Sequence, residues 1–202
     1  SDTMITEEIL AFRDLAKSGK FVNPAKRGQI TKKDIFEDYK KDVFKRVPDE
    51  LPFKLVLDGG NATPGQFLPK LLTEAGCEVI TQNTELNGEF PLGTPDPTES
   101  EYLDRLAEGV KKNKAQLGIC YDPDGDRIGI VDEDGTKIWN DVLVALFAKD
   151  ILESMPGSPI VFNTLCSKAV GDTIKAAGGE PVMWLTGHSF IKAKVKETRS
   201  PF

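Results

Sequence analysis

Short apolar runs alternate with longer amphipathic stretches along most of this chain. The short runs are rich in Val, Ile and Leu and are bounded by turn residues, which predicts β-strands. These strands cover residues 54–58, 78–82, 116–121, 127–132, 136–139, 159–163 and 181–185. Elsewhere apolar residues recur every three or four positions, which predicts helices. These helices cover residues 7–17, 65–75, 102–110, 141–153, 168–177 and 189–196.

A further helix is expected before the first strand, where Thr31 is placed to cap a stretch with apolar residues from Ile35 to Phe44. The order of elements predicts an α/β fold of two successive layered domains with mixed sheets, in which ligands bind near the carboxyl ends of strands. Residues 1–34 precede the first domain, 35–137 form it, and 138–202 form the second. Because the second range holds only two strands, that domain is expected to be truncated.

Composition and charge argue against several classes of protein. Hydrophobic residues make up 39% and charged residues 29%, so a folded core is expected. The net charge of −6 argues against nucleic-acid binding, which needs a basic face. No apolar run reaches the length of a membrane span, and no signal peptide is recognised. The cysteines, Cys77, Cys120 and Cys166, are far apart and are expected to be buried thiols of a cytoplasmic protein.

The most informative segment is Tyr121-Asp122-Pro123-Asp124-Gly125-Asp126-Arg127, which lies between two predicted strands. Its three carboxylates stand at alternate positions, and oxygen-rich clusters of this kind suit a hard cation such as Mg²⁺ or Ca²⁺. The proline and glycine shape a turn in which the carboxylates can converge. Arg127 adds a cation beside the metal, an arrangement suited to holding a phosphoryl group.

Other interpretations of this loop compete with that one. An EF-hand would need glycine where Arg127 stands and helices where the flanks are strands. A solvated acidic turn fits poorly with the apolar residues packed on both sides. A non-catalytic metal-binding module would prefer calcium. A phosphatase with an aspartate nucleophile would use Asp122 and Asp124, and trapping of its aspartyl-phosphate state by beryllium fluoride would reveal it.

Several motifs together resemble the α-D-phosphohexomutase family. The acidic loop is similar to the family's Asp-Gly-Asp-Gly-Asp-Arg loop, with Pro123 in place of the first glycine. Four further segments follow in the family's order: Asp58-Gly59-Gly60-Asn61-Ala62, Asn87–Pro91 with Thr94–Pro97, Gly178–Val182, and Thr186-Gly187-His188-Ser189-Phe190-Ile191-Lys192. The resemblance extends over most of residues 50–198.

The resemblance implies an intramolecular phosphotransferase of the isomerase class. Such an enzyme interconverts hexose 1-phosphate and 6-phosphate, of mannose or glucose, through a phosphoserine and a hexose bisphosphate. It implies Mg²⁺ on Asp122, Asp124 and Asp126, phosphoryl contact by Arg127, and sugar contact by Gly187 and His188. Residues 1–34 would be the tail of the family's first domain. Because no Thr-Ala-Ser-His-Asn-Pro-like segment carries the catalytic serine here, the chain alone is expected to be inactive.

Three smaller features have competing interpretations. His188, the single histidine, lies at a strand-to-helix turn where Ser189 could cap the helix. Some bacterial members of the family place a sugar-facing lysine where Leu165 aligns. Lys168 either substitutes for that lysine or is merely exposed on the first turn of a helix. The alternating lysines at 192, 194 and 196 are expected to be a solvated helix face.

Overall fold

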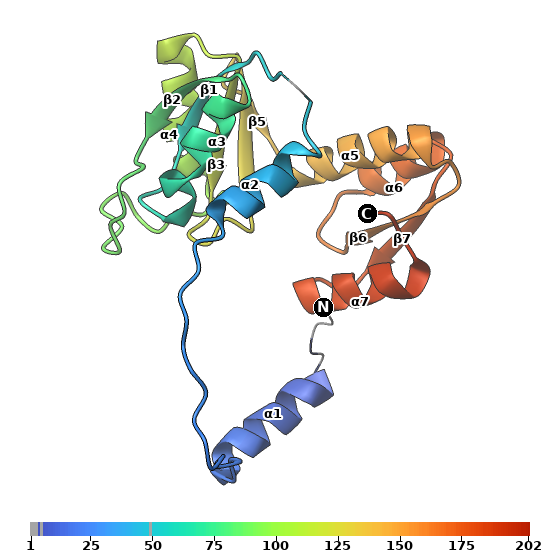
Figure 1. Cartoon of the computed structure of the whole chain (residues 1–202). Helices are drawn as coiled ribbons and strands as arrows, with labels where there is room; N and C mark the ends of the chain where they lie inside the picture. Colours follow the sequence, from blue (N-terminus) through green and yellow to red (C-terminus); the bar gives the residue numbers. More distant parts are fainter. Residues whose placement is uncertain (1–3, 5, 49) are drawn as a thin grey trace. The chain divides into compact units, whose positions relative to one another are not determined.

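The computed structural model describes residues 4, 6–48 and 50–202 (Figure 1). Residues 1–3, 5 and 49, which the predicted domain ranges include, lie outside the described residues. The chain divides into a central unit, Lys32–Asn140, and a second unit in which Asp141–Phe202 is grouped with the segment up to Thr31. We call the part from Asp141 to Phe202 the C-terminal unit. None of the helices among the described residues is long and apolar enough to cross a bilayer.

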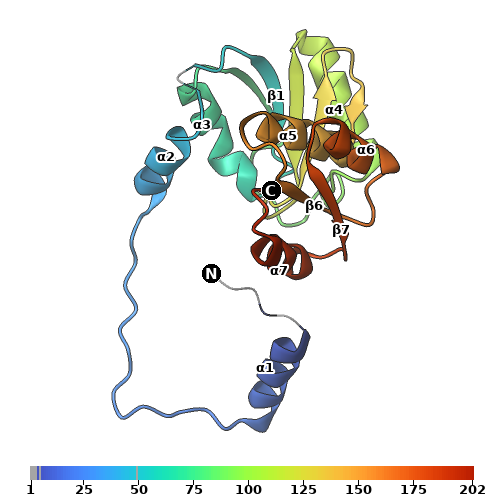
Figure 2. The ribbon, with the colours of Figure 1, turned by 90° about the vertical axis from the view of Figure 1, so that its right-hand side faces the viewer.

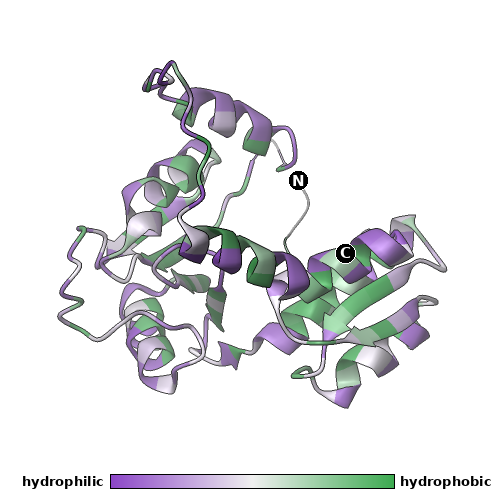
Figure 3. Ribbon diagram, turned by 90° about the horizontal axis from the view of Figure 1, so that it is seen from below, coloured by the Kyte–Doolittle hydropathy of each residue, from purple (hydrophilic) through white to green (hydrophobic). Residues whose placement is uncertain are grey.

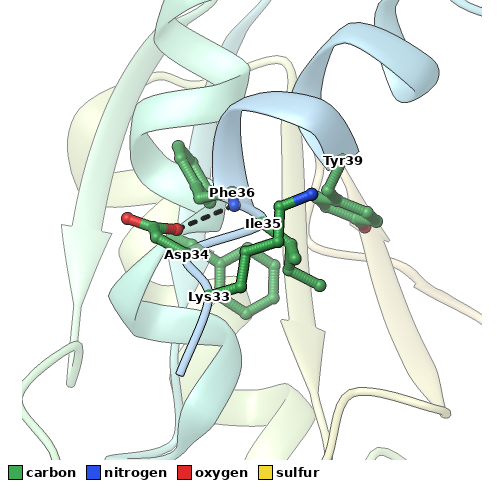
Figure 4. A pocket seen from close by; sticks show the side chains of 6 residues that line it. Lys33, Asp34, Ile35, Phe36 and Tyr39 are labelled. Carbon is green, nitrogen blue, oxygen red and sulfur yellow. Dashed lines mark hydrogen bonds between the residues drawn. The ribbon is translucent and has the colours of Figure 1, made fainter. Parts of the chain in front are cut away.

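Two helices precede the first strand, as predicted. Helix α1 spans Thr6–Ser18 and has no buried residue, and α2 spans Phe36–Phe44. The predicted cap at Thr31 is wrong, because α2 begins five residues later. There the Asp34 carboxylate accepts a hydrogen bond from the Phe36 backbone N–H at 2.9 Å (Figure 4). The start of α2 also lines an apolar pocket of about 350 Å³, formed by Lys33, Asp34, Ile35, Phe36, Tyr39 and Phe67.

A five-stranded mixed sheet forms the centre of the central unit. Its strand order is β2-β1-β3-β4-β5, with β1 at Lys54–Asp58, β2 at Glu78–Gln82, β3 at Leu117–Tyr121, β4 at Ile128–Asp132 and β5 at Lys137–Ile138. Strands β1, β2 and β3 are parallel, and β4 and β5 run antiparallel to their neighbours. Four of the five residues of β1 are buried because this strand lies between two others and is covered on both faces.

Helices cover both faces of this sheet and give three layers (Figures 1 and 2). Helix α4, Ser100–Asn113, packs on one face. The core there contains Val56, Tyr102, Leu103, Leu106, Ala107, Val110, Ala115, Cys120 and Val131. The short helix η1, Thr63–Gln66, leads into α3, Leu68–Glu74, on the other face. The core there contains Leu55, Leu57, Cys77 and Ile119, with Leu68 and Leu72 packed against it.

Cys77 and Cys120 belong to these interiors, and none of the three cysteines forms a disulfide. All three are free thiols, with Cys77 and Cys120 buried and Cys166 half-buried. Burial raises the pKa of the Cys120 thiol to about 12, which keeps it protonated and unreactive at neutral pH.

A buried carboxyl group, Asp58, ends strand β1 and is fully shielded from solvent. It accepts hydrogen bonds at 2.9 Å from the Gly60 N–H and from the Asn83 amide. The turn that follows requires glycine, because a Cβ atom on Gly59 would lie 2.8 Å from the Gly65 Cα atom. Close packing of the backbone therefore explains the glycine at position 59. Burial raises the pKa of Asp58 despite those hydrogen bonds.

This raised pKa predicts a pH-dependent stability cost. The folded state favours protonated Asp58, and this preference contributes to stability below the pKa of about 4 that the carboxyl group has in the unfolded chain. The contribution is lost as the pH rises through the higher pKa of Asp58 in the folded state. Asp58→Asn, which stays neutral, should therefore gain stability relative to the wild type as pH rises from about 4 to 7. Urea unfolding across that range measures the difference. The exposed Asp134→Asn is the control, and an equally flat difference for both variants would contradict the prediction.

The C-terminal unit is a smaller three-layer arrangement. Strands β6, Pro159–Asn163, and β7, Glu180–Trp184, are parallel and form a two-stranded sheet. Helices α5, Asn140–Ser154, and α6, Lys168–Ala176, lie on one face, and α7, His188–Thr198, lies on the other (Figures 1 and 2). The core beneath α5 and α6 contains Ala148, Leu152, Ile160, Phe162, Val170 and Ile174. Figure 3 shows the strand nearest the label C mostly in the hydrophobic colour.

Candidate functional site

The acidic loop connects β3 to β4 in the central unit, and its backbone closes tightly. Gly125 adopts a φ of +77°, a conformation that glycine accepts without strain. Its N–H donates to the Asp122 carbonyl at 3.2 Å, and the Thr63 N–H donates to the Pro123 carbonyl at 3.3 Å. The loop is therefore fixed both within itself and against the start of η1.

The structure brings the three predicted ligands together. One oxygen from each of Asp122, Asp124 and Asp126 lies within 4.8 Å of the others. Asp122 is buried, whereas Asp124 and Asp126 are exposed. Carboxylate oxygens at this spacing are the donor set that Mg²⁺ and Ca²⁺ accept, so the residues present fit a hard divalent cation.

Asp122 and Arg127 hold each other across the loop. The Asp122 carboxylate accepts hydrogen bonds from the Arg127 backbone N–H at 3.0 Å and from the Arg127 Nε at 2.8 Å. Burial by itself would raise the pKa of Asp122, but these hydrogen bonds outweigh it and lower that pKa. Asp122 is thus kept ionised, as a metal ligand must be. Because it is only 2% exposed, it is poorly placed as the nucleophile of a phosphatase.

Asp96 is a residue of the site that the sequence did not single out. Both of its carboxylate oxygens accept hydrogen bonds from Arg127 Nη1 at 3.0 Å, across 31 residues of chain. It also accepts from the backbone N–H and the hydroxyl of Thr98. The hydrogen bonds that Arg127 donates to Asp122 and Asp96 raise the pKa of its guanidinium further, so Arg127 is a permanent cation held beside the acidic loop. The motif Thr94-Pro95-Asp96-Pro97 was the available signal, but only the fold shows its partner.

The second predicted site lies at the start of α7 in the C-terminal unit. Gly187 follows β7 and has a φ of +135°, and a Cβ atom there would lie 3.1 Å from the Phe190 ring. The predicted cap by Ser189 is wrong, because α7 begins at His188 with Gly187 as its N-cap residue and no capping side chain. His188 is exposed at the first position of the helix. The turn therefore presents an imidazole beside the positive end of an 11-residue helix.

The loop after β6 lies beside this turn, because β6 and β7 are parallel neighbours. The Thr164 and Thr186 hydroxyls lie 3.2 Å apart and link the two loops. Leu165 is 79% exposed at the tip of its loop. Lys168 is paired with Asp172, one turn further along α6.

The prediction that the lysines of α7 form a solvated face is wrong for Lys194. The Lys194 ammonium lies 4.1 Å from the centre of the Trp184 ring and pairs with Glu197 at 2.6 Å. Its side chain is only 13% exposed. A long lysine stem commonly packs on apolar surface in this way, and here it covers the end of β7.

Comparisons with known proteins agree with the fold and with the position of the loop. Residues 35–135 match the family model described as phosphoglucomutase/phosphomannomutase, alpha/beta/alpha domain II, and residues 139–202 match alpha/beta/alpha domain III of the same family. The chain belongs to the phosphoglucomutase/phosphomannomutase family. The predicted resemblance and the predicted α/β fold are thereby confirmed, and the acidic loop lies within the domain II match.

Relatives in this family share over a third of their aligned residues with the chain. A phosphomannomutase/phosphoglucomutase of Pseudomonas aeruginosa is 39% identical over 197 residues, which cover 98% of this chain and 42% of that protein. A phosphomannomutase of Methanocaldococcus jannaschii is 36% identical over 171 residues, covering 85% of this chain and 38% of the relative. The chain thus spans less than half the length of these relatives.

A solved structure extends the agreement to the fold. The phosphoglucomutase/phosphomannomutase family protein of Burkholderia thailandensis superposes with a TM-score of 0.93 at 32% identity. The match covers 99% of this chain and 43% of the other.

Proposed function

We propose that the chain supplies the metal-binding loop and part of the sugar-binding surface of a phosphohexomutase. Such an enzyme interconverts hexose 1-phosphate and hexose 6-phosphate through a phosphoserine and a hexose bisphosphate. The observation that carries the proposal is the convergence of three carboxylates, with Arg127 held beside them, in a family segment. The P. aeruginosa relative is named as a phosphomannomutase and phosphoglucomutase, which supports hexose phosphates as substrates.

Asp122, Asp124 and Asp126 would hold Mg²⁺. When bound, this ion screens the negative charge that accumulates as a phosphoryl group is transferred. The chain's own residues prepare that site: Asp122 is kept ionised by Arg127, and Asp96 fixes the Arg127 guanidinium at the loop. Arg127 then stabilises the transferred phosphoryl group by its fixed positive charge.

Gly187 and His188 would bind the hexose. The backbone N–H groups at the start of α7 donate to ligand oxygens, and the exposed His188 imidazole adds a side-chain partner. As part of the same proposal, residues 35–137 are the second domain, 138–202 are part of the third, and 1–34 end the first. The enzyme would act in the cytoplasm.

A chimaera tests this function. The chain replaces the matching segment of the P. aeruginosa relative, which supplies the remainder of the enzyme. We expect the chimaera to convert glucose 1-phosphate to glucose 6-phosphate, and the isolated chain to convert none, because it contains no phosphoserine-type Thr-Ala-Ser-His-Asn-Pro segment. A coupled dehydrogenase assay measures turnover, and thermal melting verifies folding. A folded, Mg²⁺-binding chimaera without turnover would contradict the proposal.

In the same chimaera, His188→Ala should reduce kcat/KM by roughly three- to tenfold, because one hydrogen bond to a sugar hydroxyl contributes about 0.5–1.5 kcal/mol. The melting temperature should not change, since His188 is exposed. Lys192→Ala, on the same helix, is the matched control. Unchanged kinetics with a large loss of thermal stability would assign His188 a structural role instead.

A further inference from the structure

A buried tyrosine of α4 lies where two strands of the central sheet end. Tyr102 is 2% exposed and belongs to the core between α4 and the sheet. Its hydroxyl oxygen lies 3.1 Å from the Tyr121 carbonyl oxygen at the end of β3, and 3.4 Å from the Asp58 carbonyl oxygen at the end of β1. A phenylalanine would fill the same apolar space without burying a polar group, so the reason for the hydroxyl group lies in its hydrogen-bond partners.

The Tyr102 hydroxyl group is a donor held in a fixed position. It has a single hydrogen, and the shorter distance assigns that hydrogen to the Tyr121 carbonyl. Burial raises the pKa of the Tyr102 hydroxyl, which keeps its proton at neutral pH. The space around it is closed, because a Cβ atom on Gly60 would lie 2.8 Å from the hydroxyl oxygen. The Arg105 guanidinium, 5.3 Å from the centre of the ring, restrains the ring further.

The acceptor belongs to the peptide unit that carries the buried carboxylate of the acidic loop. The Tyr121 carbonyl and the Asp122 N–H are the two polar groups of one planar peptide unit. The N–H donates to the Arg127 carbonyl, at the far end of the loop, at 3.3 Å. Because both groups are hydrogen-bonded, the plane of this peptide is fixed, and with it the position of the Asp122 Cα atom.

We propose that Tyr102 is a positioning residue of the acidic loop, which acts on Asp122 through the Tyr121 carbonyl and sets the affinity of the loop for Mg²⁺. Mg²⁺ demands near-ideal ligand geometry, and removing a group that orients a metal ligand commonly changes affinity by about 10- to 100-fold. The segment from Asp96 to Tyr102 thus holds both ends of the loop, through the Arg127 side chain and through the Tyr121 carbonyl. This inference rests on the proposed metal site and adds to it a residue that supplies no ligand atom.

Titration of the ¹⁵N-labelled chain with MgCl₂ at constant ionic strength tests the proposal. The amide signals of Asp124, Gly125 and Asp126 report the dissociation constant. Tyr102→Phe keeps the ring and removes only the hydroxyl group, and should raise that constant by roughly three- to tenfold. An unchanged constant in a Tyr102→Phe chain that urea unfolding shows to be folded would overturn the role of Tyr102 and leave the metal site standing. The absence of a saturable shift in the wild type would overturn both.

Two control variants separate positioning from stability. Tyr39→Phe removes a hydroxyl group from an exposed tyrosine of the same unit and should bind Mg²⁺ as the wild type does. Val110→Ala removes two methyl groups from the same core, further along α4. It should lower the free energy of unfolding without changing the Mg²⁺ affinity of the folded chain. A loss of affinity in Val110→Ala equal to that in Tyr102→Phe would show that Mg²⁺ binding follows core stability, and would overturn the proposal.

A measurement on the unaltered chain complements the variants. Tyrosine is labelled with ¹³C at Cζ, the atom bonded to the hydroxyl oxygen. Because the hydrogen bond links Tyr102 to the loop, Mg²⁺ should shift its signal with the same saturation as the loop amides and leave the Tyr39 signal in place. A Tyr102 signal that does not move while the loop amides saturate would overturn the proposal.

Discussion

Replacing Asp124 by asparagine should lower the Mg²⁺ affinity of the chain by roughly tenfold or more and leave its unfolding temperature nearly unchanged. Mg²⁺ takes six oxygens and gives up its waters reluctantly, so three carboxylates supply about half of its shell and each one matters. Asp124 is exposed, and removing its charge relieves repulsion between neighbouring carboxylates. Calorimetry on the wild type and the variant measures both quantities, with Asp134→Asn as the control for an exposed acidic residue outside the loop.

Asp122→Asn should lose Mg²⁺ binding for the same reason but also lose stability. The buried Asp122 carboxylate accepts two hydrogen bonds from Arg127, and an asparagine amide group would present a donor to one of those donors. Hydrogen bonds to charged groups contribute about 1.5–3 kcal/mol each, so a loss on that order is expected.

Mg²⁺ binding that is unaffected by Asp124→Asn would mean that the metal lies elsewhere. Tight Ca²⁺ binding with Mg²⁺ excluded would favour a calcium-binding module.

Leu106→Ala should destabilise the central unit by about 2–5 kcal/mol. Leu106 is fully buried on α4, and close packing against β3 leaves no space to spare: a Cβ atom on Gly118 would lie 2.9 Å from the Leu106 Cγ atom. The truncation therefore opens a cavity directly beneath the strand that leads to Asp122. Because α4 and β3 are packed this tightly, they can collapse only partly into that space.

Hydrogen exchange of central-unit amides, followed by NMR during urea titration, separates this effect from unfolding of the C-terminal unit. Leu86→Ala removes the same atoms from a side chain that is 62% exposed, and should change the free energy of unfolding by less than about 0.5 kcal/mol. Equal effects of the two substitutions would show that α4 does not form the core described above.

The sequence predicted the strands better than the ends of the helices. The strands at residues 54–58, 78–82 and 159–163 have the predicted bounds, because continuous apolar runs between turn residues admit few other arrangements. Helix starts were misplaced at Thr31 and Ser189 because several polar residues near a helix end compete for the same backbone N–H groups. Which residue caps the helix depends on the direction from which the preceding segment enters it, and the local sequence pattern does not encode that direction.

The sequence by itself determined which family the chain belongs to and which loop carries the acidic residues, because motif order and alternation are local properties. It could not distinguish the three aspartates from one another. Only the tertiary structure buries Asp122, leaves Asp124 and Asp126 exposed, and brings Asp96 to Arg127 across 31 residues. These features depend on the register of β1 and β3 and on how α4 packs against them. Long-range contacts fix that arrangement, and periodicity along the chain does not specify it.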